Sequence, residues 1–452
     1  MELTRSPLLK STLKTRWPQF ILFALMLTGF LLSILSGFIG TPVGSRNFGI
    51  VFTWIAWWAV LILVAVPFLG RGWCAVCPIP LPGEWLQRGQ LLGPRETGSG
   101  SGMNRRWPNK LRNIWLQNVT FTLVALFSSV ILTTPVVSSI VLAAMLFLAL
   151  GLSLVFERRT FCRYLCPVSG FIGLYSQTAP LELRVKDKSV CSTCEGKPCY
   201  NGNAAGYGCP WDVFPGGLAK NTFCGLCLEC LRTCPHDNIA VNLRPFSADL
   251  HKPAGRRMDE AFKAFIMLGA ALVYAAVLLG PWGGWKAAAY VVGTLPWLGY
   301  AAAFLGFVFG LLPTLFLLAV STGRLLSGNS ATPRQVFVSF SYALVPLGLT
   351  AWVSFSLSFV LTNAAYILAA LSDPFGWGWN LFGTAGQAWT PYMSNLLPFL
   401  QVGMLLAGLA WSVRTALKIA AESLAGRRML FQSAPVVLFC LAVTTGLLVL
   451  LV

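Results

Sequence analysis

The soluble part of the fold is decided by residues 224–235, CGLCLECLRTCP, which place four cysteines at intervals of two, two and three residues before a proline. This spacing is the bacterial run for a [4Fe–4S] cluster, in which three close thiolates bind one cluster and the fourth ligates another. An expanded copy of the run lies upstream and also ends at a Cys-Pro pair, Cys209-Pro210. Crossed ligation therefore predicts two clusters, one held by Cys191, Cys194, Cys199 and Cys234, the other by Cys209, Cys224, Cys227 and Cys230.

Two other uses of these eight cysteines fit the sequence less well. Disulfides are disfavoured in a reducing cytoplasm, and a structural zinc site takes four ligands arranged in C-x2-C pairs, without the two Cys-Pro endings found here. His236 directly follows Cys234-Pro235. It is a candidate hydrogen-bond donor to a cluster sulfur, although a histidine in this place more often satisfies only its own loop.

Two further cysteine pairs each follow an apolar stretch. The sequences are RGWCAVCP at 71–78 and RTFCRYLCP at 159–167, so both have an arginine three residues before the first cysteine and a proline after the second. Such repeats commonly place a site at their interface. We expect a third metal site, iron–sulfur or copper, or a thiol redox pair, at Cys74, Cys77, Cys162 and Cys166. The alternative is two helix ends stopped by proline, with cysteines serving only as small apolar packing, the role we assign to the isolated Cys440.

The composition is that of a membrane protein. Hydrophobic residues make up 56% of the 452 residues and charged residues only 11%, against about 25% charged in soluble domains. We expect an all-α polytopic fold with an inserted two-cluster ferredoxin domain and about nine transmembrane helices. The predicted spans are 20–39, 50–69, 114–132, 136–156, 264–279, 298–320, 337–371, 396–419 and 434–452.

The basic residues predict the orientation of these spans. With nine spans, 31 of the 33 Lys and Arg fall in alternate loops on the side of the N-terminus, and only Arg46 and Lys286 fall on the other. Positive charge marks the cytoplasmic side, so we expect an inner-membrane protein whose N-terminus and ferredoxin domain are cytoplasmic. The net charge of +18 then fixes topology and meets anionic lipid, and no nucleic-acid partner is needed to explain it.

Three parts follow from these observations: a membrane domain of four helices at 1–180, a ferredoxin-like domain at 181–250 and a membrane domain of about five helices at 260–452. The last part has few ionisable residues within its predicted spans, which disfavours an ion pump. We expect it to form a cleft for a quinone, a docking face for another subunit, or packing alone. Haem is disfavoured because the chain has 2 His and no C-x-x-C-H sequence.

The paired Cys-Pro motifs, followed by GCPWDVFPGG and CLRTCPHDNIAVNLRPF, resemble the NapH/NosR-type membrane polyferredoxins over about residues 15–250. The resemblance implies cytoplasmic clusters and electron transfer between the quinone pool or a cytoplasmic donor and an outer reductase, as in nitrate or nitrous oxide respiration. It implies nothing firm about residues 260–452.

The first functional interpretation is therefore an iron–sulfur electron-transfer subunit, a component of a quinol dehydrogenase system, since clusters carry the redox chemistry and the protein supplies spacing and potential. Its expected partners are a quinone, or a ferredoxin- or flavodoxin-like donor, and an outer reductase or cytochrome. A second interpretation is a copper-handling reductase or assembly factor for a respiratory metalloenzyme that uses the membrane cysteines. A third, a transporter with a regulatory iron–sulfur domain, is disfavoured for ionic substrates by the scarcity of buried charge.

Overall fold

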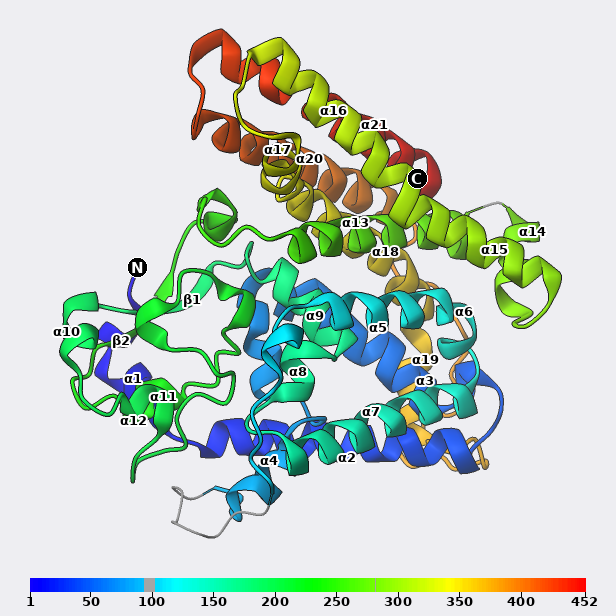
Figure 1. Cartoon of the computed structure of the whole chain (residues 1–452). Coiled ribbons are helices and arrows are strands. Elements are labelled where there is room, and N and C mark those ends of the chain that lie inside the picture. Colours follow the sequence, from blue (N-terminus) through cyan, green and yellow to red (C-terminus); the bar gives the residue numbers. More distant parts are fainter. Residues whose placement is uncertain (93–101, 281) are drawn as a thin grey trace. The chain divides into compact units, whose positions relative to one another are not determined.

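A computed structural model describes residues 1–92, 102–280 and 282–452. Helices dominate these ranges, and the sheet found there has two antiparallel strands, β1 (Leu181–Val185) and β2 (Ile239–Leu243) (Figure 1). The chain forms two compact units. Unit 1 contains residues 1–35, 64–117 and 139–249, and unit 2 contains residues 36–63, 118–138 and 250–452.

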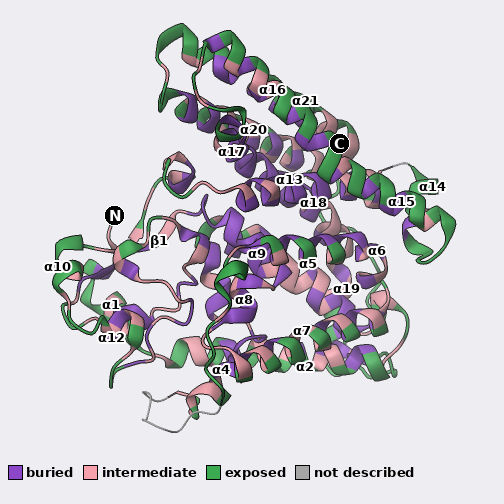
Figure 2. Ribbon diagram, in the orientation of Figure 1, coloured by how far each residue is buried: buried purple, intermediate pink, exposed green. Residues whose placement is uncertain are grey.

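Helices long and apolar enough to cross a bilayer confirm the polytopic fold. In the described part of the chain there are eight: Trp17–Ile39 (α2), Phe48–Ala75, Pro135–Val155 (α7), Met258–Leu279, Leu295–Ser327, Pro333–Asn363, Leu397–Ala421 (α20) and Gly426–Leu451 (α21). Several of them expose large apolar side chains, which Figure 2 shows as exposed segments along α2 and α7. In α2 these include Ile21, Leu25 and Leu35, each about half exposed or more. Such surfaces require lipid rather than water around them.

The predicted span 114–132 differs from the other eight because its helix is interrupted. Helix α5 (Trp115–Leu126) ends at Phe127 and is followed by the short helix α6 (Ser128–Ile131). Twelve helical residues span only about 18 Å, less than the hydrocarbon thickness of about 30 Å. The count of nine was therefore approximate, because hydropathy detects an apolar stretch without detecting a break inside it.

Unit 1 joins apolar helices to the cysteine-rich insert. Besides α2 and α7 it contains α1 (Pro7–Lys14), α4 (Leu81–Arg88), α8 (Thr160–Tyr164), α9 (Pro167–Tyr175), α10 (Lys188–Thr193), α11 (Pro198–Asn201) and α12 (Glu229–Thr233). The two strands pair from Leu181 opposite Leu243 to Val185 opposite Ile239. The chain start extends this edge, because the Met1 amino group donates to the Leu243 carbonyl at 2.8 Å.

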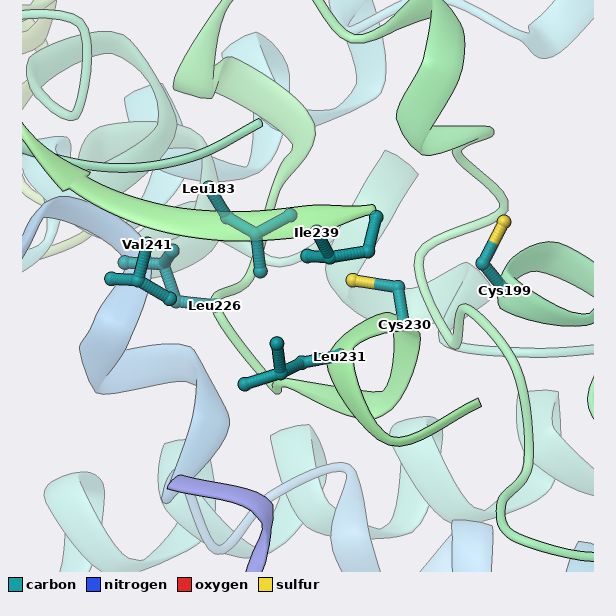
Figure 3. Close-up of a cluster of buried hydrophobic side chains, with 7 residues drawn as sticks. All are labelled: Leu183, Cys199, Leu226, Cys230, Leu231, Ile239 and Val241. Carbon is teal, nitrogen blue, oxygen red and sulfur yellow. The ribbon is translucent and has the colours of Figure 1, made fainter. Parts of the chain in front are cut away.

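A small hydrophobic core supports the insert. Leu183 on β1 and Ile239 and Val241 on β2 pack with Leu226 and Leu231, and all five are less than 9% exposed. Figure 3 shows Cys230 and Leu231 side by side on the same short helix, with Cys199 on another. This core fixes the loop 224–231 against the sheet, so that the position of the first three cysteines of the run is determined by ordinary apolar burial.

Unit 2 is a helical bundle. The main helices of this bundle are α13 (Met258–Tyr274), α16 (Leu312–Ser327), α18 (Leu344–Asn363), α20 and α21. Helix α16 packs on α21, and α18 packs on both α13 and α20. Most of α18 is buried, as the purple ribbon in Figure 2 shows. The α18–α20 contact is close, since a Cβ atom at Gly408 would lie 1.8 Å from Thr350 Oγ1. Small residues commonly permit such approaches between membrane helices.

The remaining helices of unit 2 are short or interrupt longer ones. They are α3 (Phe48–Ile50), α14 (Gly283–Tyr290), α15 (Leu295–Leu305), α17 (Pro333–Ser341) and α19 (Ala365–Ser372). Residues 36–63 and 118–138 belong to this unit although they precede the insert in sequence. The compact units thus cut across the linear division into 1–180, 181–250 and 260–452, which stays a prediction based on sequence.

Candidate functional site

Twelve of the thirteen cysteines lie in unit 1, and all thirteen are free. Electrostatic interactions among the thiols fall mainly within three groups of four, with one interaction between groups, that of Cys230 with Cys199. The membrane group is Cys74, Cys77, Cys162 and Cys166; the Cys227 group is Cys209, Cys224, Cys227 and Cys230; and the Cys191 group is Cys191, Cys194, Cys199 and Cys234. These are the sets that the sequence predicts.

The Cys227 group surrounds a cavity. All four of its cysteines line a partly open space of about 350 Å³, including its mouth, together with Trp211 and apolar residues of the insert. The loop between them is bent by two residues with left-handed backbone conformations, Leu226 (φ 49°) and Leu228 (φ 64°). Such conformations cost roughly 1–2 kcal/mol each for residues with a Cβ atom. A loop bent at this cost around a cavity lined by thiols fits a bound cluster better than it fits simple packing.

The Cys191 group receives hydrogen bonds from one residue that the sequence did not single out. The backbone N–H of Asn238 donates to Cys234 Sγ at 3.3 Å, and its side-chain amide donates to Cys191 Sγ at 3.4 Å. His236, the predicted donor, is exposed. Hydrogen bonds to thiolate sulfurs tune the potential of iron–sulfur clusters, so Asn238 is the better candidate for this role.

The membrane group is assembled from both sequence repeats. Cys74 ends the long helix Phe48–Ala75, Cys162 lies on α8, and Cys166 precedes α9, where its sulfur accepts the Ser169 N–H at 3.4 Å. Gln117 donates to the carbonyl of Cys162 at 2.8 Å. Cys74, Cys162 and Cys166 are buried, and Cys77 is partly exposed.

The two repeat arginines each reach across to the other repeat. Arg71, from the first motif, donates to the hydroxyl and the carbonyl of Ser169, both at 2.9 Å. Arg159, from the second motif, donates to the carbonyl of Cys74 at 2.6 Å and forms an ion pair with Glu84. Both arginines are at most 5% exposed. This exchange explains why the same residue type stands at the same place in both motifs.

Trp211 connects the membrane group to the Cys227 group. It follows Cys209-Pro210, is 1% exposed, and lines the Cys227 cavity. The guanidinium of Arg71 lies 4.7 Å from its ring centroid, and that of Arg159 lies 5.8 Å from it. The loop is anchored by Arg163, which donates to the Trp211 carbonyl at 2.5 Å. One buried indole thus lies between two arginines of the membrane motifs and one cavity of the insert.

Burial raises the pKa of the thiols outside the membrane helices. The pKa of Cys166 rises to about 12, that of Cys227 to about 12 and that of Cys224 to about 11, in each case mainly through desolvation. Ligand thiols must lose their protons to bind metal. Positive charge is therefore needed at these sites, from bound iron and from the neighbouring arginines.

The arrangement of donors favours clusters over a single metal ion. No three His, Cys, Asp or Glu side chains within residues 1–92, 102–280 and 282–452 lie where they could share one metal ion. A tetrahedral zinc or copper ion holds its sulfurs close together, with Zn–S distances of about 2.3 Å. In a four-iron cluster each thiolate binds a different iron, which suits more widely spaced thiols around a cavity. The cavity lined by the four thiols of the Cys227 group fits this kind of ligation.

The membrane motifs, rather than the insert, match a known family. A family model described as a 4Fe-4S binding domain matches residues 50–97 and again residues 138–186. The first match contains Cys74 and Cys77, and the second contains Cys162 and Cys166. No curated protein and no solved structure matches the chain. The matches support iron–sulfur chemistry in unit 1 and bear out the internal repeat.

Four contributors to the sites were missed by sequence reasoning: Ser169, Glu84, Trp211 and Asn238. Trp211 was adjacent to a ligand cysteine and Asn238 lay four residues beyond another, so their proximity was a usable signal. Glu84 carried a different signal, because it is the single acidic residue between Gly70 and Gly93, where the other two charged residues are Arg71 and Arg88. A buried arginine needs a carboxylate or another anion, and Glu84 supplies it for Arg159.

Proposed function

We propose that this chain is a membrane-bound iron–sulfur electron-transfer protein with three cluster sites. The observation that carries the proposal is the series formed by the three cysteine groups. Trp211 and two arginines join the membrane group to the Cys227 group, and Cys230 interacts with Cys199 of the Cys191 group. When bound, the clusters would supply one-electron redox chemistry, while the chain sets their spacing, burial and surrounding charge.

A pocket beside the Cys227 group supports a quinol as electron donor. Its apolar wall comes from α2 and α4 and includes Phe20, Phe23 and Trp85. Its polar wall is charged, and is formed by Tyr207, Glu84, Glu229 and four arginines, Arg16, Arg88, Arg159 and Arg232. Cys227 also lines it, and the empty volume is about 510 Å³ including the open mouth. Small-molecule and cofactor pockets typically measure about 300–1,000 Å³ and combine apolar walls with a few polar groups. A quinol in this pocket would lie beside a cluster ligand.

The acceptor and the orientation rest on other arguments. The basic loops support a cytoplasmic position for the three cysteine groups, and the resemblance to the NapH/NosR-type proteins supports an outer reductase of nitrate or nitrous oxide respiration as acceptor. A cytoplasmic ferredoxin- or flavodoxin-like donor is the alternative to the quinol. Metal handling has less support, because the family model that matches both membrane motifs describes a 4Fe-4S binding domain.

The test is reduction of the iron–sulfur absorbance and EPR signals in purified full-length protein by a quinol or by reduced ferredoxin. Leu91→Trp would fill the mouth of the pocket, and Leu111→Trp is a matched control, since both leucines are exposed and only Leu91 lines the pocket. We expect Leu91→Trp to slow reduction by quinol at least tenfold and to leave reduction by dithionite unchanged, with no effect of Leu111→Trp. Signals that respond to neither donor would contradict electron transfer as the function.

A further inference from the structure

The positive charge of Arg71 is unusual among the buried arginines of unit 1. Arg159 pairs with Glu84, Arg232 with Glu229, and Arg244 with Glu182 and Asp249. Arg71 is 2% exposed, and among the described residues no carboxylate pairs with it. Its guanidinium donates to the hydroxyl and the carbonyl of Ser169, a neutral residue, and also has a side-chain contact with Cys74. A buried charge without an opposite charge is strongly unfavourable.

The groups that face Arg71 are thiols. Its guanidinium interacts electrostatically with Cys74, Cys162 and Cys166 of the membrane group, and also with Cys224 of the Cys227 group. Its Nε atom is buried and has no hydrogen-bond partner. A four-iron cluster held by four thiolates carries net negative charge, so it would supply the anion that the protein around Arg71 lacks.

The local structure holds Arg71 in this place. Ser169 and the Trp211 ring fix the guanidinium from two sides. On a third side the backbone of α9 approaches so closely that a Cβ atom at Gly173 would lie 2.2 Å from Nη2 of Arg71. Glycine at this position is what admits the guanidinium. The charge is therefore fixed in position and does not have to move when the site changes redox state.

We propose that Arg71 is the charge-compensating residue of the membrane cysteine group and that it raises the reduction potential of the cluster bound there. This inference rests on the proposed function, because it requires a cluster at Cys74, Cys77, Cys162 and Cys166. A fixed cation stabilises the more negative, reduced form of a nearby redox group. Arg71 acts through its charge and is not itself a ligand of the cluster. Arg159, whose charge is balanced by Glu84, contributes less to the reduction potential.

The test is a redox titration of full-length protein followed by EPR, with iron per chain measured on the same samples. The membrane-group signal is identified as the one that Cys162→Ala removes. Arg71→Gln removes the charge, Arg71→Lys keeps it, and Arg244→Gln is a matched control in which a buried arginine that is balanced by Glu182 and Asp249 is neutralised.

We expect Arg71→Gln to lower the potential of the membrane-group signal by at least the equivalent of a tenfold change in the ratio of reduced to oxidised protein, which is about 59 mV for one electron. Arg71→Lys should shift it less, and Arg244→Gln should leave it unchanged. If Arg71→Gln loses the membrane-group iron while Arg71→Lys keeps it, the charge is needed to hold the cluster and the inference stands.

An unchanged potential in Arg71→Gln with full iron content would overturn the inference and leave the proposed function intact. Loss of the same iron in both Arg71 variants would also overturn it, because the effect would then come from the shape of arginine and not from its charge. Absence of a signal that depends on Cys162 in native protein would instead refute the third cluster itself, so the two failures are distinguishable.

Discussion

Unit 1 and unit 2 both contain long apolar helices, yet their buried charges differ in kind. In unit 2, Asp259, Glu260 and Lys263 lie in the first two turns of α13 and are at most 4% exposed. Glu260 accepts the Tyr342 hydroxyl at 2.5 Å, and Asp259 pairs with Arg257. In unit 1 the buried arginines surround thiols, and Arg71 lacks a carboxylate.

This difference in buried charge indicates that the redox chemistry of the chain lies in unit 1. In unit 2 the buried carboxylates of Asp259 and Glu260 are satisfied by Arg257 and Tyr342, so they need no ligand to explain them. Unit 1 contains surplus positive charge next to twelve thiols, which a set of anionic clusters would balance. Unit 2 contains a single cysteine, Cys440, 1% exposed within α21. We therefore expect changes in unit 1 to affect iron binding and changes in unit 2 to affect stability alone.

The largest effect on stability is expected from Arg159→Gln in unit 1. This change removes the arginine that binds both oxygens of Glu84, which is 3% exposed, and leaves Arg88 paired with one of them at 3.1 Å. Removing one member of a buried ion pair costs about 3–5 kcal/mol, and because Arg88 remains we expect a loss at the lower end of this range. Thermal unfolding in detergent should show a lower midpoint, with loss of iron from the membrane group. The double variant Arg159→Gln/Glu84→Gln should recover part of the stability, and no recovery would contradict the ion pair as the cause.

A smaller effect is expected from Gly408→Ala in unit 2. The added methyl group would meet Thr350 between α18 and α20, and overpacking of this kind costs about 1–3 kcal/mol. The unfolding midpoint should fall while iron per chain and the EPR signals stay at native values. Gly403→Ala, on the same helix but in open space, is the control. Iron loss in Gly408→Ala would break the proposed separation between the two units.

The smallest effect concerns pH and His251 in unit 2. Burial, and then the charges of Lys418, Arg414 and Arg256, lower the pKa of His251 from 6.5 to about 4. The folded state thus favours the neutral ring. The full stability of the folded state is therefore present above pH 6.5. Part of it is lost as the pH falls from 6.5 to 4, because the unfolded state binds the histidine proton first. Solvent screening at this partly exposed site limits the loss to about 1 kcal/mol.

Unfolding midpoints of native protein and His251→Gln at pH 7.5 and pH 4.5 check this expectation. Native protein should lose more stability on acidification than His251→Gln does, since glutamine has no proton to gain. Glu422 accepts hydrogen bonds from Arg256, one of the cations near His251. The variant Glu422→Gln is therefore measured in parallel, to separate its effect from that of His251. Equal losses in native protein and His251→Gln would contradict the role given to the histidine.

Much of the fold could be predicted from the sequence because the apolar runs and the cysteine spacing are both distinct patterns. Apolar runs of twenty residues identified the spans, and cysteine spacing with crossed ligation predicted which thiols lie together. The start of α13 was placed too late, at 264 instead of Met258. Asp259, Glu260 and Lys263 interrupt the apolar pattern there, and hydropathy does not show that tertiary contacts allow a helix to bury them.

The sites were less predictable in their surroundings than in their ligands. The arginine at the same place in both motifs was visible in the sequence, but its partner was not, because Arg71 and Ser169 are separated by 98 positions. The same holds for the contact between Arg159 and Glu84, 75 positions apart. Contacts at such separations depend on how the helices pack, and no local pattern encodes them. The break between α5 and α6 at Phe127 contains no proline or glycine, so the sequence does not indicate it.

The most direct test of three cluster sites is iron and acid-labile sulfide per chain in anaerobically purified full-length protein, compared with Cys162→Ala and Cys440→Ala. Three four-iron clusters predict about 12 irons per chain in native protein and about 8 in Cys162→Ala. Cys440→Ala should retain about 12, because its thiol lies alone in an apolar helix. Equal iron in native protein and Cys162→Ala would contradict the account, since the membrane cysteines would then hold no cluster.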